Sequence, residues 1–475
     1  FMTSNNNDTT ILTRIAQRSC AWSERWFPDA FAFAVLAVGI IAIAAMINGA
    51  PPVEVAKAFG DGFWNLSPFA MQMCFIIIGG YVAADSPPVA RLIFALARVP
   101  ASGRKAILLI AVFSMLLSLL HWGLSLVLSS LLVRALARRT DLRMDYHAAA
   151  ASAYLGVGSV WAMGLSSSAA QLQANPASMP ANMLAITGVI PFEETIFLWQ
   201  SIVLTLILTV VSALVAWYSA PNDAQARTAT QLGIEIEISQ HQLPPRTRPG
   251  EWLEYSPLLN IGIVVIGLVW LAMEFSTKGP VLAISSFNTY NFLFLMLGLL
   301  LQWRPKNFLE AVARSVPSVA GVLIQFPFYA GVAAILSKAT NAEGTSLAMG
   351  LSHFFTQICT HDTFALITGS YSAVLGLFFP SAGGKWIIEA PYVMQTANDL
   401  QYHLGWTVQI YNAAEALPNL INPIWMLPVL GILKLSARDL IGYTFVQFIV
   451  HVPLVLFLLW LFGTTLSYHP PVMPS

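Results

Sequence analysis

Charged side chains are scarce in this sequence. Asp, Glu, Lys and Arg make up only 10% of its 475 residues, whereas 57% are apolar and the mean hydropathy is +0.68. Soluble domains are about a quarter charged, so this composition excludes a water-soluble protein. One helical crossing of a bilayer needs about 20 apolar residues, so the chain is long enough for roughly ten crossings. The sequence therefore indicates an all-α polytopic membrane protein.

Features that define other classes of protein are missing. The formal net charge is zero, without the basic excess expected of a nucleic-acid-binding protein. Cys20, Cys74 and Cys359 are scattered, without disulfide or zinc spacing. The metalloprotease pattern His-Glu-x-x-His and the nucleophile pattern Gly-x-Ser-x-Gly do not occur. We expect no nucleic-acid partner, no metal, no cofactor and no enzyme activity.

Seven stretches are apolar over a length that suits a membrane span. They lie near Phe31–Ile47, Ser67–Ala84, Phe192–Tyr218, Ser256–Phe275, Asn288–Leu301, Ser318–Leu336 and Asp439–Phe462. Residues 219–255 are polar instead, and Pro244, Pro245 and Pro249 mark this segment as a loop.

Two further regions consist of short apolar arms that meet at a polar or glycine-rich tip. The arms are Ile107–Leu120 and Leu124–Leu136, then Thr363–Phe379 and Ile387–Ala397. The tips are His121-Trp-Gly123 and Pro380-Ser-Ala-Gly-Gly-Lys-Trp386. Irregular backbone at membrane depth is tolerated only beside protein or a watery cavity. We therefore predict two re-entrant hairpins, over 106–138 and 363–397.

Each hairpin is followed by a long helix with an interruption. The first, over 146–173, is broken around Gly156-Val-Gly-Ser159 and Gly164-Leu-Ser-Ser-Ser168. The second, over 405–435, is broken around Pro418-Asn-Leu-Ile-Asn-Pro423. Glycine and proline at these positions weaken or end a helix. The pattern predicts two broken helices.

The order of elements repeats, because each half reads span, span, surface arm, hairpin, broken helix, span. Each half crosses four times, and one linking span between the halves turns the second half upside down. The predicted segments are a cytoplasmic N-terminal tail (1–25), a first repeat (26–218), a cytoplasmic loop (219–255), a linking transmembrane helix (256–276) and a second, inverted repeat (277–475).

The distribution of basic residues supports this topology. Of the 23 Lys and Arg residues, only Lys57, Lys278 and Lys338 fall in segments predicted to lie outside, and Lys385 lies in a hairpin tip. Cytoplasmic loops carry an excess of Lys and Arg. We therefore predict nine crossings, with the N-terminus cytoplasmic and the C-terminus outside.

Inverted repeats with broken helices are typical of secondary transporters, in which substrate and coupling ion bind near the bilayer midplane. A channel would normally place a selectivity filter on the symmetry axis of like subunits. The residues that carry chemistry are expected at the two tips and the two breaks.

Four segments carry a resemblance to a known family. They are Arg25-Trp-Phe-Pro-Asp29, His121-Trp-Gly-Leu-Ser125, Pro380-Ser-Ala-Gly-Gly-Lys-Trp386 and Asn419-Leu-Ile-Asn-Pro-Ile-Trp425. With them the chain resembles the bacterial short-chain fatty acid (acetoacetate/butyrate) transporters of the ion-transporter superfamily. This resemblance implies a homodimer in the bacterial inner membrane, with a fixed scaffold and a mobile elevator domain whose tips and breaks clamp an anionic substrate.

The second tip is the predicted anion site. Ser381, Gly383 and Gly384 offer a hydroxyl and bare N–H groups at a helix start, which favours a carboxylate, although glycines also make plain turns. Lys385 is a charge at membrane depth, and Glu389 lies one turn further on. Either Lys385 contacts the substrate, or the two residues form a structural pair.

The remaining candidates each have a second interpretation. Glu415, with Glu389, is the candidate for ion coupling, or it caps the broken helix; His121 either titrates near neutral pH or is structural. Amide oxygens of Asn419 and Asn422 are predicted to coordinate at the second break.

Hydroxyls and backbone at the first tip and break either bind substrate or pack helices; these residues are Gly123, Ser125, Gly158, Ser159, Ser166, Ser167 and Ser168. Four tryptophans beside the tips and breaks either wall the cavity or anchor the protein at the interface; they are Trp122, Trp161, Trp386 and Trp425.

The sequence thus predicts symport of a short-chain monocarboxylate across the membrane with H+ or Na+. The alternative is a dicarboxylate or amino-acid carrier of the same fold. Two carboxylates would need two cationic groups, and Lys385 is the one evident at the predicted site. The superfamily's dicarboxylate carriers place Ser-Asn-Thr at their tips, which this chain lacks, so the choice between H+ and Na+ stays open.

Overall fold

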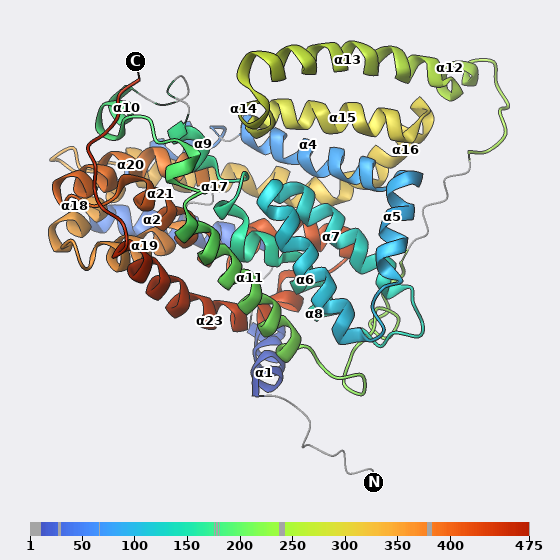
Figure 1. Cartoon of the computed structure of the whole chain (residues 1–475), viewed down its shortest axis with the longest axis horizontal. Coiled ribbons are helices and arrows are strands. Elements are labelled where there is room, and N and C mark those ends of the chain that lie inside the picture. The colour runs from blue at the N-terminus through green and yellow to red at the C-terminus, as the bar shows by residue number, and fades with distance from the viewer. Residues whose placement is uncertain are drawn as a thin grey trace, which may run out of the picture.

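The computed structural model describes residues 11–26, 30–65, 67–174, 176, 179, 181–236, 243–377 and 382–474, and their regular structure is helical (Figure 1). Among these residues six helical segments are long and apolar enough to cross a membrane, or up to eight crossings if each of two bent pairs counts as one. The chain is a multi-pass membrane protein.

One group of helices comes from the start of each half of the chain. Its members are α2 (Ala30–Ile47), α3 (Pro52–Gly62), α4 (Ser67–Ala84), α13 (Pro257–Lys278), α15 (Phe287–Gln302), α16 (Pro305–Ser315) and α17 (Ala320–Lys338). Within this group α4 packs against α15 and α16, and α17 packs against α2 and α3. Each half therefore contributes the partner of a helix in the other half.

The second group contains the two hairpins, the two broken helices and the last helix of each half. Its members are α6 (Gly103–Leu120), α7 (Trp122–Ala137), α8 (Tyr146–Leu155), α9 (Ser168–Ala174), α11 (Trp199–Ser219), α19 (Phe364–Gly376), α20 (Ala382–Asp399), α21 (Leu404–Asn419), α22 (Leu427–Leu433) and α23 (Ala437–Gly463). The first helix of the first hairpin, α6, packs against α8 of the first broken helix, and the first helix of the second hairpin, α19, packs against α21 of the second broken helix. The two groups meet where α4 contacts α7 and where α17 contacts α22.

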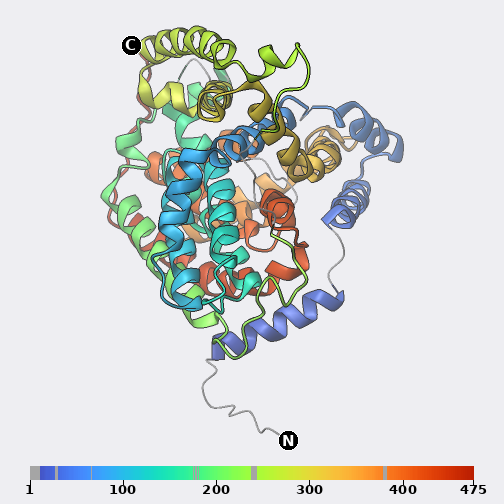
Figure 2. The same cartoon turned by 90° about the vertical axis from the view of Figure 1, so that its right-hand side faces the viewer.

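Other helices, most of them short, belong to neither group. They are α1 (Ile11–Trp26), α5 (Pro87–Ala97), α10 (Ala181–Thr187), α12 (Glu251–Tyr255), α14 (Pro280–Ser285) and α18 (Leu347–Ile358). In that view α5, α12 and α16 lie on the right, whereas α10, α18 and the C end of the chain lie on the left. Figure 2 shows α1 at the lower edge and α13, in yellow-green, along the upper edge.

The sequence explains where most helices begin. Ser102 and Asp145 accept hydrogen bonds from backbone N–H groups three residues on, which caps α6 and α8. Ser436 and Asp439 form a capping box at the start of α23. Proline opens α3, α5, α13 and α16, where its missing N–H is harmless.

Both predicted breaks are present in the structure. After α8 the chain passes through a π-helical turn over Gly156–Val160 and a 3-10 turn over Trp161–Met163 before α9 begins. A Cβ on Gly156 would lie 2.5 Å from the Ser114 carbonyl oxygen, so glycine is required for α6 to approach this break. The second broken helix ends α21 at Asn419 and turns by 75° into its second part.

The structure also corrects several predicted boundaries. The first hairpin arm begins at Gly103, not Ile107, so α6 has 18 residues and is long enough to cross a membrane alone. A 3-10 turn over Phe192–Glu194 delays the start of α11 to Trp199. The predicted tail contains α1, which packs against α23. The sequence analysis also missed α3 and α16, because amphipathic helices this short lack an apolar run.

Candidate functional site

Lys385 lies in the first turn of α20, between two buried glutamates, where α20 packs against α21. Its Nζ is 2.7 Å from Glu415 Oε2 and 3.4 Å from Glu389 Oε1. The side chains of Lys385, Glu389 and Glu415 are 0, 1 and 3% exposed. The predicted pair of Lys385 with Glu389 is present, and Glu415 makes the shorter contact. We call Lys385, Glu389 and Glu415 the charge cluster.

The helix α19 completes the surroundings of the charge cluster. Lys385 Nζ donates hydrogen bonds to the carbonyl and the hydroxyl of Ser372, both at 2.8 Å. The Ser372 hydroxyl donates in turn to Glu389 Oε2 at 3.0 Å. A Cβ on Gly376 would lie 3.6 Å from Glu415 Oε2 and 3.7 Å from Lys385 Nζ. The end of α19 therefore lies directly against the ion pair.

The charges in this cluster do not balance if all three groups are ionised. One ammonium faces two carboxylates, and an uncompensated charge away from water costs several kcal/mol. Like charges this close favour a state in which one carboxyl group keeps a proton. The charge cluster is electrically neutral when one of its two carboxyl groups carries a proton.

Aromatic rings cover the other side of the cluster. Lys385 Nζ lies 4.5 Å from the centroid of the Tyr411 ring, a cation–π distance, and the Tyr411 and Trp386 ring centroids are 4.6 Å apart. Trp386 is fully buried. The role of Trp386 as a cavity wall or as an anchor stays a prediction.

Asn419 and Asn422 tie the second break to its neighbours. Asn419 Nδ2 donates to the Val157 carbonyl in the first break at 3.1 Å, and Asn422 Nδ2 donates to the Leu377 carbonyl at the end of α19 at 3.0 Å. The Asn422 side-chain oxygen accepts from Ile424 N–H at 3.1 Å, while the backbone carbonyl of Asn419 accepts from the Tyr154 hydroxyl. Asn419 therefore joins the second break to the first broken helix, and Asn422 joins it to α19.

The comparison with known proteins identifies the family. Residues 11–462 match the family model described as short chain fatty acid transporter. The chain belongs to the short-chain fatty acid transporter family. Two relatives carry this name provisionally: one from Escherichia coli strain K12 is 34% identical over 91% of this chain and 96% of its own length, and one from Haemophilus influenzae is 29% identical over 94% and 98%.

Two solved transporter structures also match along most of their length. MtrF of Neisseria gonorrhoeae, described as one of a class of antimetabolite efflux pumps, is 15% identical with a TM-score of 0.47, covering 96% of this chain and 99% of its own. The YdaH transporter of Alcanivorax borkumensis, described as having an unusual topology, is 16% identical with a TM-score of 0.44, covering 92% and 98%.

In this transporter two serines of the first broken helix contact α21 and the start of α20. The Ser167 hydroxyl donates to Asn412 Oδ1 at 2.9 Å, and a Cβ on Gly383 would lie 3.5 Å from Ser168 Cβ. Gly383 and Gly384 lie in the first turn of α20. Ser381 lies outside the described residues. The structure thus brings Ser167, Ser168, Gly383 and Gly384 to the same end of α20 as Lys385.

Other serines of the first half of the transporter serve as packing contacts. The Ser125 hydroxyl donates to the Ser114 carbonyl and the Ser166 hydroxyl to the Ser118 carbonyl, both at 2.6 Å. Ser159 shares a 2.7 Å hydrogen bond with Ser212 of α11. These bonds join the first hairpin and α11 to the first break.

Two glycines of the first half also lie in close contacts. A Cβ on Gly158 would lie 2.6 Å from Leu420 Cδ2, and one on Gly123 would overlap Ile76. Gly158 therefore lies against the second break, and Gly123 against α4.

His121 and Trp122 lie at the boundary between the two helix groups. The His121 ring stacks on Tyr290 of α15 with centroids 3.3 Å apart, and its Nδ1 accepts from Gly123 N–H. Trp122 contacts Trp425 edge to face at 5.3 Å. Trp122 and Trp161 are 6% exposed, which is unlike interfacial anchors. His121 thus caps α7, and its role in ion coupling stays a prediction.

Sequence analysis missed a polar stripe on α21. Gln409, Asn412, Glu415 and Asn419 follow one another at spacings of three or four, which places them on one helical face. Asn412 Nδ2 donates to Gln409 Oε1 at 2.7 Å, and Gln409 Nε2 donates to the Ser201 hydroxyl at 2.8 Å. The spacing alone could have shown this stripe. No spacing pattern in the sequence could have shown that Ser372 contacts the charge cluster.

Three potential metal ligands converge near the C end of the chain, where atoms of Glu194, His403 and His469 lie within 4.8 Å of one another. His403 Nδ1 accepts a hydrogen bond from Trp406 N–H, so the proton sits on Nε2. Both ring nitrogens of His469 face acceptors, Glu194 Oε2 at 2.8 Å and the Pro470 carbonyl at 3.1 Å. This pattern fits an imidazolium–carboxylate pair better than three lone pairs directed at a metal.

Proposed function

We propose that the charge cluster is the place where this transporter binds a short-chain monocarboxylate, such as butyrate or acetoacetate, together with one proton. The observation that carries the proposal is the ratio of one buried ammonium to two buried carboxyls. Such a cluster is expensive to bury for structure alone, since apolar residues of similar volume are often equally stable or better.

The proposed cycle follows from the charges. In the empty site, Lys385 is balanced by one carboxylate, and the second carboxyl is protonated. A substrate anion at Lys385 adds one negative charge, and a proton on the remaining carboxylate restores neutrality. Anion and proton therefore bind together and leave together, which makes the transport step electroneutral.

Neighbouring groups suit a carboxylate with a short apolar tail. The first turn of α20 offers backbone N–H groups of Gly383 and Gly384 beside Lys385, and a helix start favours an anion. Trp386 and Tyr411 supply apolar surface for the tail. A dicarboxylate would need a second cation, and Lys385 is the one buried Lys or Arg in the described part of the chain. We therefore place the dicarboxylate or amino-acid carrier second.

For the architecture, we propose an inverted repeat that works as an elevator. The repeat is supported by the way helices of the two halves pack in pairs, α4 with α15 and α17 with α2. The division of the helices into two groups supports an elevator, with the hairpin group as the mobile part and the group of α2–α4 and α13–α17 as the fixed part. The position of α5, α12 and α16 opposite the C end in Figure 1 supports a periplasmic C-terminus, and the cytoplasmic N-terminus rests on the distribution of Lys and Arg. The inner membrane and the homodimer rest on the family resemblance.

The test is uptake of labelled butyrate into proteoliposomes under a pH gradient or a sodium gradient imposed separately. We expect the pH gradient, acid outside, to drive accumulation without added sodium. Glu415→Gln imitates the permanently protonated carboxyl, so we expect it to abolish gradient-driven accumulation while butyrate exchange continues, because exchange needs no net proton release.

Glu389→Gln and Glu54→Gln are the comparison variants. Glu54 is an exposed carboxylate in α3, and its substitution is expected to change nothing. If Glu389→Gln abolishes accumulation and Glu415→Gln does not, the coupling proton belongs to Glu389. Accumulation driven by sodium alone would overturn proton coupling, and normal accumulation in the double variant Glu389→Gln, Glu415→Gln would remove the cluster from coupling.

A further inference from the structure

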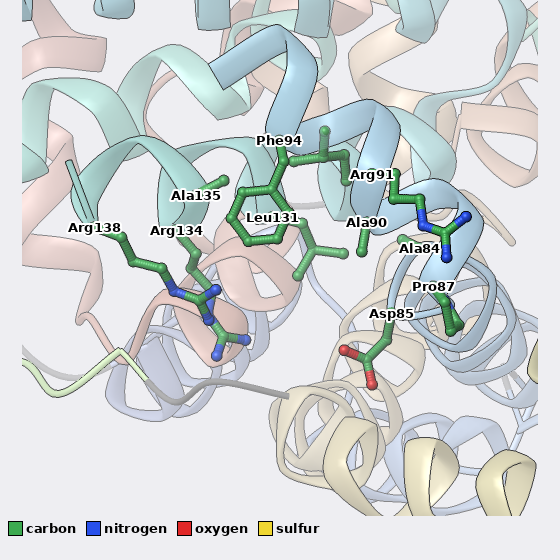
Figure 3. Close-up of a pocket in the computed structure, with 11 residues that line it drawn as sticks. Ala84, Asp85, Pro87, Ala90, Arg91, Phe94, Leu131, Arg134, Ala135 and Arg138 are labelled. Atoms are coloured by element: carbon green, nitrogen blue, oxygen red, sulfur yellow. The ribbon is translucent and has the colours of Figure 1, made fainter. Parts of the chain in front are cut away.

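A cavity of about 280 Å³ lies between α5 and α7, away from the charge cluster. Figure 3 shows three arginines around it: Arg91 from α5, and Arg134 and Arg138 from the end of α7. Asp85 and apolar side chains form the rest of its wall, with Phe94 and Leu131 across its centre. The cavity therefore has a cationic part and an apolar part.

The charge of the lining is positive whichever pairs its residues make. The lining holds three guanidinium groups and one carboxylate, that of Asp85, and Asp85 is itself in an ion pair with Arg314 of α16 at 2.7 Å. Arg134 and Arg138 are four residues apart on one helix, a spacing at which like charges repel. An anion in the cavity would relieve this repulsion.

The apolar part lies at the surface helix α5. Pro87 opens this helix after a 78° bend from α4, and its exposed side chains include Leu92 and Phe94 beside Arg91. Arg138 lies over the Phe94 ring, 5.8 Å from its centroid. A helix with apolar and basic side chains on its exposed surface is typical of the plane between lipid headgroups and acyl chains.

We propose that this cavity binds the headgroup of an anionic glycerophospholipid. The phosphate lies between Arg134 and Arg138, since arginine forks suit phosphate oxygens. The glycerol and the first acyl carbons lie against Phe94 and Leu131. Basic pockets between membrane helices on the cytoplasmic side are known to suit anionic headgroups. A lipid here bridges α5 and the hairpin helix α7.

The test is lipid binding to the delipidated full-length transporter in detergent, followed by native mass spectrometry. Phosphatidylglycerol is compared with phosphatidylcholine of identical acyl chains, and inorganic phosphate is the soluble competitor. We expect phosphatidylglycerol to bind at least roughly tenfold more tightly than phosphatidylcholine. The double variant Arg134→Gln, Arg138→Gln should lose about tenfold in phosphatidylglycerol affinity.

Two further variants separate a shaped site from diffuse attraction. Arg98→Gln removes an exposed arginine just after α5 that does not line the cavity, and it should bind as the unaltered protein does. Ala90→Phe fills the cavity while all the arginines remain, and it should abolish the preference for phosphatidylglycerol. Butyrate binding by each variant checks that the protein is folded.

Three outcomes would overturn the proposal. Equal loss in Arg98→Gln and the double variant would indicate diffuse attraction to basic charge. Unchanged preference in Ala90→Phe would place the lipid elsewhere. Displacement of the lipid by inorganic phosphate at equal concentration would make the cavity a site for a soluble anion.

Discussion

The first and second hairpin regions contain the same kinds of helix, but their buried polar contacts differ in charge. In the first, the neutral hydroxyls of Ser125 and Ser166 donate to backbone carbonyls of α6. In the second, Lys385 lies among Glu389, Glu415 and Ser372. The comparison shows that two helical hairpins with similar elements can hold different polar groups. The first region contains close packing contacts, and the second contains the buried charges to which we assign binding and coupling in the proposed function.

The largest expected effect comes from removing the cation of the second region. Lys385→Gln leaves Glu389 and Glu415 facing each other in a buried site, and breaking a buried ion pair typically costs about 3–5 kcal/mol. Butyrate affinity should fall roughly tenfold to a hundredfold, as for a lost charged hydrogen bond. Thermal unfolding in detergent and the butyrate dissociation constant measure the two effects.

Lys57 provides a matched control for that variant. Lys57 and Asp61 are also four residues apart and 2.9 Å from each other, but their side chains are 66 and 64% exposed. An exposed pair is worth about 0–1 kcal/mol, so Lys57→Gln should change little. If Lys385→Gln destabilises the protein no more than Lys57→Gln, the second region does not depend on buried charge. Full recovery of affinity on adding Glu389→Gln would end the role of Lys385 as a ligand.

A smaller effect is expected from overfilling the first region. A Cβ on Gly156 would lie 2.5 Å from the Ser114 carbonyl oxygen and 2.7 Å from Ser125 Oγ, so Gly156→Ala should cost about 1–3 kcal/mol. The number of protons carried per butyrate should not change. Gly262→Ala in α13, where a Cβ meets nothing within 4 Å, is the control. Lost proton coupling with unchanged stability in Gly156→Ala would contradict the division between the regions.

The smallest effect concerns the titratable groups near the start of α21. The hydrogen bond to the Pro470 carbonyl and the nearby Glu194 raise the pKa of His469 above its ordinary value of 6.5. Because the folded-state pKa is raised, the stabilisation is fully present below pH 6.5 and is lost as the pH rises through that raised pKa. Burial lowers the pKa of the neighbouring His403, whose contribution has the opposite sign.

Hydrogen exchange of the amides around His469, corrected for the intrinsic pH dependence of exchange, measures this effect. The segment should open more at pH 8 than at pH 6, and His469→Gln should remove most of that difference. His361→Gln, another exposed histidine beside a carboxylate, serves as the control. An unchanged pH dependence in His469→Gln would show that the pair of His469 with Glu194 does not stabilise this segment.

Much of the fold could be predicted, since its signals are local. Apolar runs gave α2, α4, α13, α15, α17 and α23 within a few residues, and Gly156 and Pro418 lie at real breaks. The start of α6 was missed because Gly103, Arg104 and Lys105 look like a loop, although Ser102 caps a helix there. Local amphipathic helices such as α1 and α16 were missed because their apolar residues are too few for a span.

The candidate site was predicted only in part. The pair of Lys385 with Glu389 follows from a spacing of four on one helix, so the sequence contains it. The shorter contact of Lys385 with Glu415 depends on how α20 lies against α21, which no local pattern specifies. Ser372 reaches the same ammonium only because α19 packs beside both helices.

The sequence by itself determined that this is a helical membrane protein, that two helices break, and that a charge lies near a hairpin tip. These follow from composition, from the backbone limits of glycine and proline, and from neighbours along one helix. Only the tertiary structure decided that the two glutamates share one lysine, and that three arginines of α5 and α7 face one cavity. The reason is physical: burial and charge balance depend on groups brought together across helices, and their free energy is set by how closely the helices pack.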